Sequence, residues 1–401
     1  MPQSAIRMLS IVFAGFVVAA APASAATELV VYSFGSVAND GIFPAAGLID
    51  VGGTLYGTTA NTAGDAPRDG TVFSVTPSGV EKVVYSFGSA PHDGANPQAG
   101  LIEVGGKLYG TTYNGGSASG GTVFSVTPLG VEKAVYSFGS VAHDGANPEA
   151  ALIDVGGTLY GTTRYGGRST QCAGGCGTVF SVTRSGVEKV VYSFGSVAND
   201  AVNPQTGLID VAGTLYGTTS TGGSAACGCG AVFSVTPSGV ENVVYSFGSV
   251  ANDGANPQAG LIVVDGTLYG TTVSGGSVSS TNCGGGGCGT VFSVTTAGAE
   301  KVVYSFGSVA NDGTNPQAGL IRVGGKLYGT TIYGADTYGT VFSVTPSGDE
   351  KVIYSFHARK KGDTPIAGLI EVGGTLYGTT FYGGAARYCG DGCGTVFSVN
   401  P

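Results

Sequence analysis

Tryptophan does not occur in the 401-residue chain, and charged residues make up only 11% of it. The strongest stacking side chain for sugars and cations is therefore missing, although 20 tyrosines remain. There are three histidines, and no G-x-S-x-G motif is present to hold a hydrolase nucleophile. The net charge of −9 argues against nucleic acids and anionic membrane surfaces as partners. No constellation typical of catalysis stands out, so an enzyme is the less favoured class.

The first 25 residues have the features of a secretory signal peptide. Arg7 precedes the apolar run Met8–Ala21, and Ala23-Ser24-Ala25 forms an A-x-A cleavage site. The run is short for a membrane span, so we expect no membrane insertion once residues 1–25 are removed. No cysteine follows the cleavage site and the chain has no hydrophobic C-terminal tail, so we expect no anchor. The expected location is periplasmic or secreted.

What the sequence has in abundance is glycine, 73 residues, and one repeated word, Leu-Tyr-Gly-Thr-Thr. The word recurs at a spacing near fifty residues, which together with the strand-forming residues around it is typical of a propeller or an array. Its seven copies occupy residues 55–59, 108–112, 159–163, 215–219, 268–272, 327–331 and 376–380.

Each copy lies in a unit of four strands, which we name A to D in chain order. In the second unit these are Leu101–Val104, Lys107–Thr112, Gly121–Thr127 and Val131–Phe138. Gly-Gly pairs suit the A–B turn and Pro-x-Gly suits the C–D turn. Strand B carries the repeated word, and a variable Gly-rich loop follows it. The unit is expected to be an antiparallel meander, with strand A innermost and strand D outermost.

The two ends of the chain predict how the units close. Glu28–Phe34 reads as a D strand with no strands before it, and Gly394–Pro401 reads as a C strand with no D strand after it. Pairing them removes two exposed sheet edges. We therefore predict an all-β, seven-bladed β-propeller over residues 26–401, a single domain and a monomer. An open array or a differently split ring is the alternative.

Several words recur in fixed order: Y-S-F, D-G-x-x-P-x-A-G-L-I, G-G-x-L-Y-G-T-T and G-T-V-F-S-V-T-P-x-G. This pattern resembles the GloVer (Gloeo/Verruco) tandem-repeat family of bacterial exported proteins. The blades are similar to those of NHL-type β-propellers, without their signature residues. The resemblance covers all seven copies and implies the fold and export, but no catalytic residue. Members of the family often carry a C-terminal sorting segment, and this sequence ends at Pro401 without one.

The eight cysteines form four local pairs, all in the variable loops between strands B and C: Cys172/Cys176, Cys227/Cys229, Cys283/Cys288 and Cys389/Cys393. In an exported protein these are expected to be disulfides, which stiffen their loops more than they stabilise the whole fold. Zinc shared between neighbouring units is an alternative. The spacing of Cys227 and Cys229 is tight for a local bridge, so pairing between neighbouring blades remains open for them.

The B–C loops and the D–A loops should share one face of the disc, where the sequence varies most and binding is expected. Four loop tyrosines, which stack on a sugar or peptide or else cover their own Gly-Gly turns, are Tyr113, Tyr165, Tyr333 and Tyr382. Each D–A loop also carries an aspartate that holds a ligand such as Ca²⁺ or forms an Asx-turn: Asp40, Asp93, Asp144, Asp200, Asp253, Asp312 and, in a divergent loop, Asp363.

One further acidic position recurs at the start of every D strand, and its glutamates are expected to be solvated charges at the outer edge. The leading hypothesis for function is an exported, non-enzymatic scaffold that binds an extracellular glycan or protein through the loop face. A lactonase-like hydrolase or lyase with a site at the mouth of the central channel is one alternative. A purely structural surface module is another, and no metal or other cofactor is required by either scaffold hypothesis.

Overall fold

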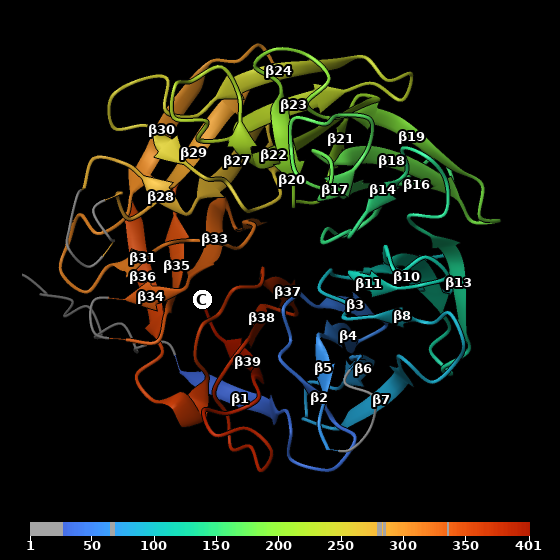
Figure 1. Ribbon diagram of the computed structural model, residues 1–401. Coiled ribbons are helices and arrows are strands. Elements are labelled where there is room, and N and C mark those ends of the chain that lie inside the picture. Colours follow the sequence, from blue (N-terminus) through green and yellow to red (C-terminus); the bar gives the residue numbers. More distant parts are fainter. Residues whose placement is uncertain (1–26, 65–68, 279–282, 284–285, 335–336) are drawn as a thin grey trace, which may run out of the picture.

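The computed structural model describes residues 27–64, 69–278, 283, 286–334 and 337–401. In this part of the chain, seven four-stranded antiparallel blades stand in a ring around a central axis (Figure 1). The predicted signal peptide lies outside the described residues. Within the described ranges, no helix is long and apolar enough to cross a membrane. The predicted all-β propeller is thus confirmed.

The blades repeat one strand pattern, and strand B contains the repeated word in each. The A strands are β3 (Ile49–Val51), β9 (Ile102–Val104), β15 (Ile153–Val155), β21 (Ile209–Val211), β26 (Ile262–Val264), β32 (Ile321–Val323) and β37 (Ile370–Val372). The B strands are β4 (Thr54–Thr59), β10 (Lys107–Thr112), β16 (Thr158–Thr163), β22 (Thr214–Gly222), β27 (Thr267–Thr272), β33 (Lys326–Thr331) and β38 (Thr375–Thr380).

The outer half of each blade follows the same order. The C strands are β6 (Thr71–Val75), β12 (Thr122–Val126), β18 (Thr178–Thr183), β23 (Ala231–Val235), β29 (Thr290–Thr295), β35 (Thr340–Val344) and β39 (Thr395–Val399). The D strands are β7 (Glu81–Ser86), β13 (Glu132–Ser137), β19 (Glu188–Ser193), β24 (Glu241–Ser246), β30 (Glu300–Ser305), β36 (Glu350–Ser355) and β1 (Glu28–Ser33).

The N-terminal strand closes the ring. β1 pairs antiparallel with β39, with Glu28 opposite Val399 and Ser33 opposite Thr395, so the seventh blade has the order β1-β39-β38-β37. Figure 1 shows this blue strand beside the red strands of the C-terminal end. The register includes the same bulge in the outer strand that the other six blades have, as between Val72 and Phe73 opposite β7. The predicted closure is confirmed.

The hydrophobic core lies in the seven seams between neighbouring blades. In the first seam, Val72 of one blade packs with Leu108 and Phe124 of the next, all fully buried. In the closing seam, the rings of Phe34 and Phe73 meet edge to face with centroids 4.8 Å apart. Burial of each such side chain stabilises the fold by roughly 1.5–3 kcal/mol. Because every blade supplies half of two seams, closing the ring completes the core.

The repeated word is explained by this packing. At Gly57, an added Cβ would lie 2.7 Å from the ring of Phe73 on the adjacent C strand, so only glycine leaves room for that ring. The next residue, Thr58, donates its hydroxyl to the carbonyl of Ala99 in the following blade at 2.9 Å. Thr379 makes the equivalent bond to Ala46 at 3.1 Å across the closing seam. The word therefore serves packing.

Short strands tie the D–A loops to the B–C loops on one face of the disc. The strands in the D–A loops are β2 (Gly41–Ile42), β8 (Gly94–Ala95), β14 (Gly145–Ala146), β20 (Ala201–Pro204), β25 (Gly254–Ala255) and β31 (Gly313–Thr314). Those in the B–C loops are β5 (Asn61–Thr62), β11 (Asn114–Gly115), β17 (Tyr165–Gly166), β28 (Ser274–Gly275) and β34 (Tyr333–Gly334). In the fourth blade, β20 pairs with an extended β22.

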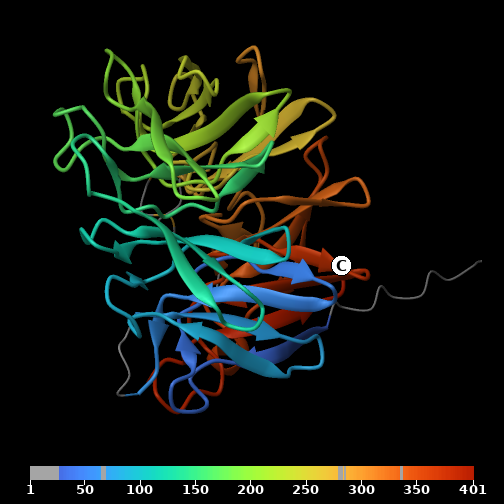
Figure 2. The ribbon, with the colours of Figure 1, turned by 90° about the vertical axis from the view of Figure 1, so that its right-hand side faces the viewer.

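This pairing places both loop types on the face seen in Figure 1, as expected, and Figure 2 shows the disc from the side. The seventh D–A loop differs from the others because it contains the short 3₁₀ helix η2 (Arg359–Lys361) in place of a paired strand. We call the face formed by these loops the loop face.

Candidate functional site

The aspartates predicted on the loop face are directed into their own loops. Asp40 is almost fully buried, and its Oδ2 accepts a hydrogen bond from the hydroxyl of Tyr32 at 2.8 Å and one from the amide of Ser36 at 3.2 Å. The Tyr–Asp bond recurs at Asp93, Asp144, Asp200, Asp253 and Asp312. These carboxylates organise the turn between strand D and the next blade, so we leave them out of the proposed binding surface.

The seventh D–A loop requires a correction, because Asp363 does not occupy the position of the other aspartates. Gly362 packs against Thr380 as Gly41 packs against Thr59, which aligns Lys361 with Asp40. Asp363 instead bridges to Tyr382, in the place that Ile42 has opposite Asn61. The loop is one residue shorter than its relatives, and the sequence alone did not show where the deletion falls.

The glutamates that begin the D strands are a second correction, since they are half-buried and not solvated edge charges. One carboxylate oxygen of each is shielded from solvent and accepts no hydrogen bond: Glu28, Glu81, Glu132, Glu188, Glu241, Glu300 and Glu350. Burial and then the nearby charge of Asp40 raise the pKa of Glu81 to about 7. In the seventh blade, Lys361 places its Nζ 3.4 Å from the carboxylate of Glu28.

The four predicted loop tyrosines do not form one set. Tyr113 is the first residue after the repeated word, the position of Arg164 and Phe381, whereas Tyr165, Tyr333 and Tyr382 are the second. Tyr333 and Tyr382 are 55% and 40% exposed. Tyr165 is covered by the guanidinium of Arg164, 5.2 Å from the ring centroid. Of the four predicted tyrosines, Tyr333 and Tyr382 are thus the two with open rings on the loop face.

At five seams, an asparagine on the loop face holds neighbouring blades together. It adopts a left-handed backbone conformation, and its side-chain amide donates to a B–C loop carbonyl of the preceding blade at 2.9–3.1 Å. The five are Asn96, Asn147, Asn203, Asn256 and Asn315. Asparagine suits this backbone conformation better than most residues do.

At the closing seam, Phe43 takes the place of that asparagine. Its φ of 61° is left-handed, which is unfavourable for a bulky residue and indicates that its surroundings hold it there. Its ring stacks on Phe381 with centroids 5.2 Å apart and an angle of 20° between the planes. It also meets the ring of Tyr382 edge to face at 5.7 Å. Side-chain stacking has here replaced a hydrogen bond to the backbone.

Two hollows flank Tyr382 on this part of the loop face. One, of about 870 Å³, is lined by residues including Phe43, Ile42, Tyr382, Tyr388 and Asp391. The other, of about 560 Å³, is lined by Tyr333, Tyr338, Arg359, Thr364, Tyr382 and Asp391. Because Tyr382 and Asp391 line both, we treat the two hollows as one site and call it the aromatic cleft. It spans the sixth, seventh and first blades.

The polar groups of the aromatic cleft centre on Arg359 of η2. Its guanidinium forms ion pairs with Asp391 and, at 3.6 Å, with Asp363. The same group lies 5.4 Å from the ring centroid of Tyr338, within range of a cation–π interaction. The cleft therefore joins open aromatic rings to a carboxylate and a guanidinium with free hydrogen-bonding capacity, since Arg359 and Asp391 are half-exposed and exposed.

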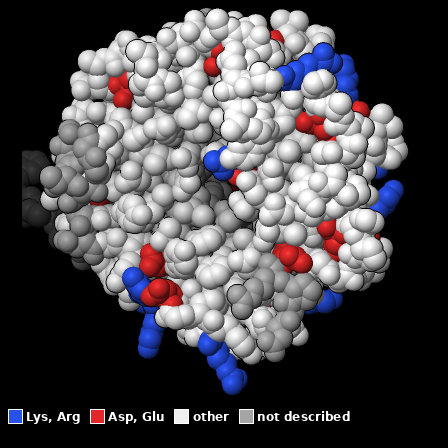
Figure 3. Space-filling model, viewed as in Figure 1, with Lys and Arg blue, Asp and Glu red and all other residues white. Residues whose placement is uncertain are grey.

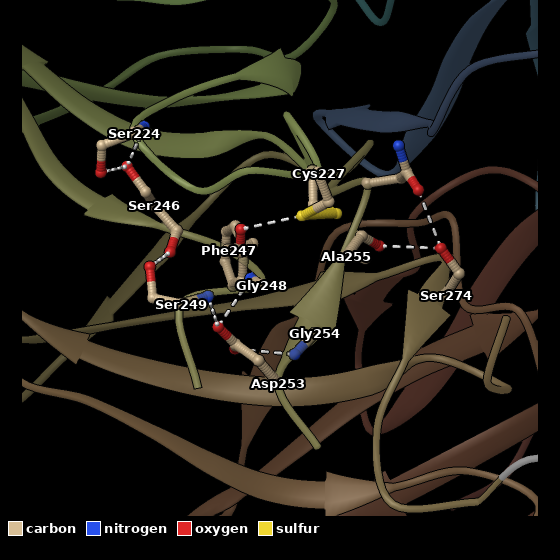
Figure 4. Close-up of a disulfide and its surroundings, with 12 residues drawn as sticks. Ser224, Cys227, Ser246, Phe247, Gly248, Ser249, Asp253, Gly254, Ala255 and Ser274 are labelled. Carbon is tan, nitrogen blue, oxygen red and sulfur yellow. Dashed lines mark hydrogen bonds between the residues drawn. A yellow bond between two sulfur atoms is a disulfide. The ribbon is translucent and has the colours of Figure 1, made fainter. Parts of the chain in front are cut away.

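All four cysteine pairs form disulfides within their own loops, as predicted. This includes Cys227–Cys229 (Figure 4), so pairing between blades does not occur there. In Figure 4 the sulfur of Cys227 points at the carbonyl of Phe247, at 3.7 Å, beneath the D–A loop that Asp253 organises. The bridge between Cys389 and Cys393 has a direct role in the cleft, because Cys389 lines its larger hollow.

The placement of three of these bridges is a third correction, because only one of their two cysteines belongs to the loop surface. The second cysteine of each bridge is fully buried and forms part of the hydrophobic core of a seam: Cys176, Cys288 and Cys393. The surroundings of Cys288 show why the second cysteine is buried. Its side chain packs with Val291 and Phe306, and an added Cβ at Gly307 would lie 2.7 Å from its sulfur.

The backbone of Cys288 is held as well, since its carbonyl accepts a hydrogen bond from the amide of Asn315 at 2.8 Å. The bridge to the half-buried Cys283 therefore fastens a surface loop to the core. Cys288 is closed to a ligand, and so are its two equivalents. The expectation that the bridges stiffen their loops more than they stabilise the whole fold did not include this anchoring, because the spacing of the cysteines does not show that the second one begins the buried approach to strand C.

Outside the aromatic cleft, the described part of the loop face has fewer features of a binding site. Figure 3 shows few charged side chains on it and a hollow at its centre. Gln258 and Gln317 of neighbouring blades are hydrogen-bonded at 2.5 Å, and Glu149 pairs with Arg164 at 2.9 Å. Among the described residues, no group of three or more His, Cys, Asp or Glu side chains is placed to hold a metal ion.

Sequence reasoning named Tyr333 and Tyr382 but missed that both line one site with Arg359. It also missed Phe43, Phe381, Tyr338, Tyr388 and Asp391. The available signal was a departure from the repeat, since Phe43 stands where five other units have asparagine. Seen one at a time along the chain, such departures do not show that blades six, seven and one are neighbours.

Solved structures that resemble this chain are propellers of low sequence identity. PorZ of Porphyromonas gingivalis, a surface component of the type-IX secretion system, matches with a TM-score of 0.53 and 14% identity over 88% of this chain and 46% of that one. This chain thus spans about half the length of PorZ. A gluconolactonase from Xanthomonas campestris matches with a TM-score of 0.44 and 11% identity over 94% and 89% of the two chains. These likenesses concern the fold alone.

No curated protein gave a significant sequence match. The family comparison is informative, because the Gloeobacter/Verrucomicrobia repeat matches residues 13–174, 92–281 and 228–401, which together span nearly the entire chain. The recurring words, the seven blades and this match agree, and the chain belongs to the Gloeobacter/Verrucomicrobia repeat family.

Proposed function

We propose that this protein is an exported, non-enzymatic scaffold that binds a carbohydrate chain in the aromatic cleft. The observation that carries the proposal is the stack of Phe43 on Phe381 beside the open ring of Tyr382, at the one described seam where an aromatic residue replaces the bridging asparagine or threonine. The aromatic rings offer flat apolar faces of the size of a sugar ring, which binds such faces through its C–H groups.

The polar groups beside the rings favour a sugar over a purely apolar ligand. Arg359 and Asp391 provide donors and acceptors in one place, and a sugar presents neighbouring hydroxyls that can both donate and accept. Sites for small ligands are commonly apolar with a few such polar groups. The length of the cleft, with hollows on both sides of Tyr382, fits a chain of several sugar units better than a single one.

The same contacts favour binding over catalysis. The two carboxylates at the cleft, Asp363 and Asp391, both form ion pairs with Arg359. A hydrolase that uses two carboxylates needs them in different environments beside one scissile bond. In the described part of the cleft, we find one carboxylate at the surface and one against the loop backbone, and both contact the same guanidinium. An extracellular or periplasmic location, where glycans are plentiful, is part of the proposal.

A glycan array probed with the mature protein tests the proposal, followed by titration calorimetry on the best ligand. Tyr382→Ala should lower the affinity at least about tenfold, because a stacked ring contributes on the order of 1 kcal/mol or more. Tyr165→Ala is the matched control, since Tyr165 occupies the same position in the third blade and should leave the affinity unchanged.

The array also separates the alternatives. Binding to peptides and to no glycan would replace the carbohydrate with a protein partner and refute the ligand class. Equal losses of affinity in both tyrosine variants would place the site elsewhere on the ring. Turnover of a lactone or a polysaccharide by the mature protein would refute the non-enzymatic role.

A further inference from the structure

Six of the seven seams contain a tyrosine between two carboxyl groups from different blades. The hydroxyl of Tyr32 donates to Asp40 at 2.8 Å, and the carboxyl group of Glu81 from the next blade faces the same pair, with one oxygen shielded from solvent and without a hydrogen-bond partner. Equivalent groups meet at the seams of Asp93 and Glu132, Asp144 and Glu188, Asp200 and Glu241, Asp253 and Glu300, and Asp312 and Glu350. Lys82, which follows Glu81, is exposed on the opposite face of the strand.

The number of hydrogens available for hydrogen bonds among these three side chains shows which of them must be protonated. The tyrosine has one hydroxyl hydrogen, and it points at the aspartate. The aspartate carboxylate in turn accepts amide hydrogens of its own loop. At Tyr85 and Tyr304 a serine hydroxyl already donates to the tyrosine oxygen. In every one of the six seams, a hydrogen bond between the glutamate and the tyrosine oxygen needs a hydrogen from the glutamate, which can donate only when it is protonated. Two ionised carboxylates this close in a buried seam would repel each other.

At the seventh seam, a lysine stands beside the glutamate in place of the aspartate. Lys361 occupies the position of the aspartate, and its ammonium lies 3.4 Å from the carboxylate of Glu28. The hydroxyl of Tyr354 contacts that carboxylate too, at 3.3 Å. A positive charge is thus supplied to the seventh glutamate by a side chain, whereas each of the other six faces an acid. This internal comparison indicates that the six seams take up a positive charge from solution.

We propose that each of these six seams binds a proton, held on the D-strand glutamate and shared through the tyrosine with the aspartate of the preceding loop. The hydrogen bonds then run from glutamate to tyrosine to aspartate to the loop amides, and they join one blade to the next. The ring is consequently most stable in mildly acidic surroundings, and its seams weaken as the pH rises through neutrality.

The direction of the pH effect follows from the pKa values. Burial, with the aspartate charge as second cause, raises the pKa of Glu81, Glu188 and Glu241 to about 7, from 4.5 in the unfolded chain. The same holds for Glu132, Glu300 and Glu350. Between these values the folded protein binds more protons than the unfolded chain does. The stabilisation is complete below pH 4.5 and is lost as the pH rises through about 7.

Thermal unfolding of the mature protein between about pH 5 and pH 8.5, in buffer with EDTA, tests the proposal. The Tm should fall by at least about 3 °C from pH 5.5 to pH 8. Glu188→Gln mimics the protonated acid, because its amide can donate to Tyr136. This variant should be more stable than the unmodified protein at pH 8 and match it at pH 5.5.

Glu28→Gln is the matched control at the seventh seam, where it removes the partner of Lys361 and should lower the Tm at pH 8. A Tm that is constant or rises from pH 5.5 to pH 8, or a Glu188→Gln variant with no gain at pH 8, would overturn the proposal. A Tm at pH 8 that rises with Ca²⁺, and no longer does so in Glu188→Gln, would also overturn it by showing that the seams bind a metal ion.

Discussion

Phe43 stacks on Phe381 across the seam at which the first and last blades meet. Five other seams are joined on the loop face by an asparagine that donates to a backbone carbonyl. The closing seam has therefore exchanged the hydrogen bond that asparagine makes in five other seams for a pair of stacked, half-buried rings. This exchange holds Phe43 in a left-handed backbone conformation. The ring of Phe43 packs against the core of the closing seam and also lines the larger hollow of the aromatic cleft, where we propose that it contacts the glycan.

Phe43→Asn should separate stability from binding. Asparagine tolerates the observed φ, and it can donate to the carbonyl of Phe381 as its equivalents do. These gains offset the lost packing of the ring against Phe381 and the closing seam, so the free energy of unfolding should change by less than about 1 kcal/mol. Affinity for the glycan should fall at least about tenfold, because the stacked face is lost. Urea unfolding and calorimetry measure the two effects.

Asn203→Ala provides the comparison for that variant. It removes the bond from Asn203 to the carbonyl of Arg164, at 3.1 Å, and should lower the free energy of unfolding by about 1 kcal/mol without changing the affinity. If Phe43→Asn retained full affinity, the aromatic stack would have to be assigned to seam packing.

Arg359→Ala should weaken binding at least about fivefold while changing the Tm little. The guanidinium is half-exposed and its pair with Asp391 is open to solvent, and ion pairs of this kind contribute little to folding. The matched variant is Arg164→Ala, which removes the ion pair with Glu149 and the contact with Tyr165 in the third blade. It should leave the affinity unchanged, and an equal loss in both variants would argue for a diffuse charge effect.

The disulfide of the seventh blade should matter for binding more than for stability. Cys389→Ser with Cys393→Ala frees the loop that lines the larger hollow while keeping the buried position apolar, so the affinity should fall, whereas closing a loop this short contributes little to the free energy of unfolding. Cys172→Ser with Cys176→Ala changes a bridge of the same spacing in the third blade. That variant should bind the glycan normally, and a loss there would contradict a site confined to the cleft.

The fold could be predicted from the sequence because its determinants repeat. Gly57 and its equivalents make room for a phenylalanine ring in every blade, and the unpaired strand at each end of the chain indicated how the ring closes. The site could be predicted only in part. Tyr382 was predicted as a binding residue, but its meeting with Phe43 depends on closure, which brings together residues more than three hundred positions apart.

The burial of the D-strand glutamates could not be predicted from the sequence, for a different reason. Glu81 follows a turn and precedes a lysine, a pattern typical of a solvated edge. Tyr32 and Asp40, which face Glu81, come from a distant part of the chain, so the strand that carries Glu81 does not reveal its surroundings. Lys361 was likewise overlooked, because the one-residue deletion before Asp363 can be placed only when the loops are superimposed in space.

Deletion of Glu28–Phe34 should prevent the formation of a stable monomer. β1 covers the edge of β39, and Phe34 fills the closing seam against Phe73, a side chain whose loss alone costs about 3–5 kcal/mol. The exposed edge of β39 is free to pair with other chains. Light scattering after size-exclusion chromatography should therefore show oligomers or aggregates.

A chain with its N-terminal strand moved to the other end is the control for this deletion. In this variant, Glu28–Phe34 is moved behind Pro401, and a short Ser-Gly linker completes the missing C–D turn. The seventh blade is then built like the other six, with strand D following strand C in the chain. The rearranged protein should be monomeric and unfold with a Tm close to that of the original. If the deletion variant were itself a stable monomer, or if the rearranged protein failed to recover, closure by β1 would not be what holds the ring together.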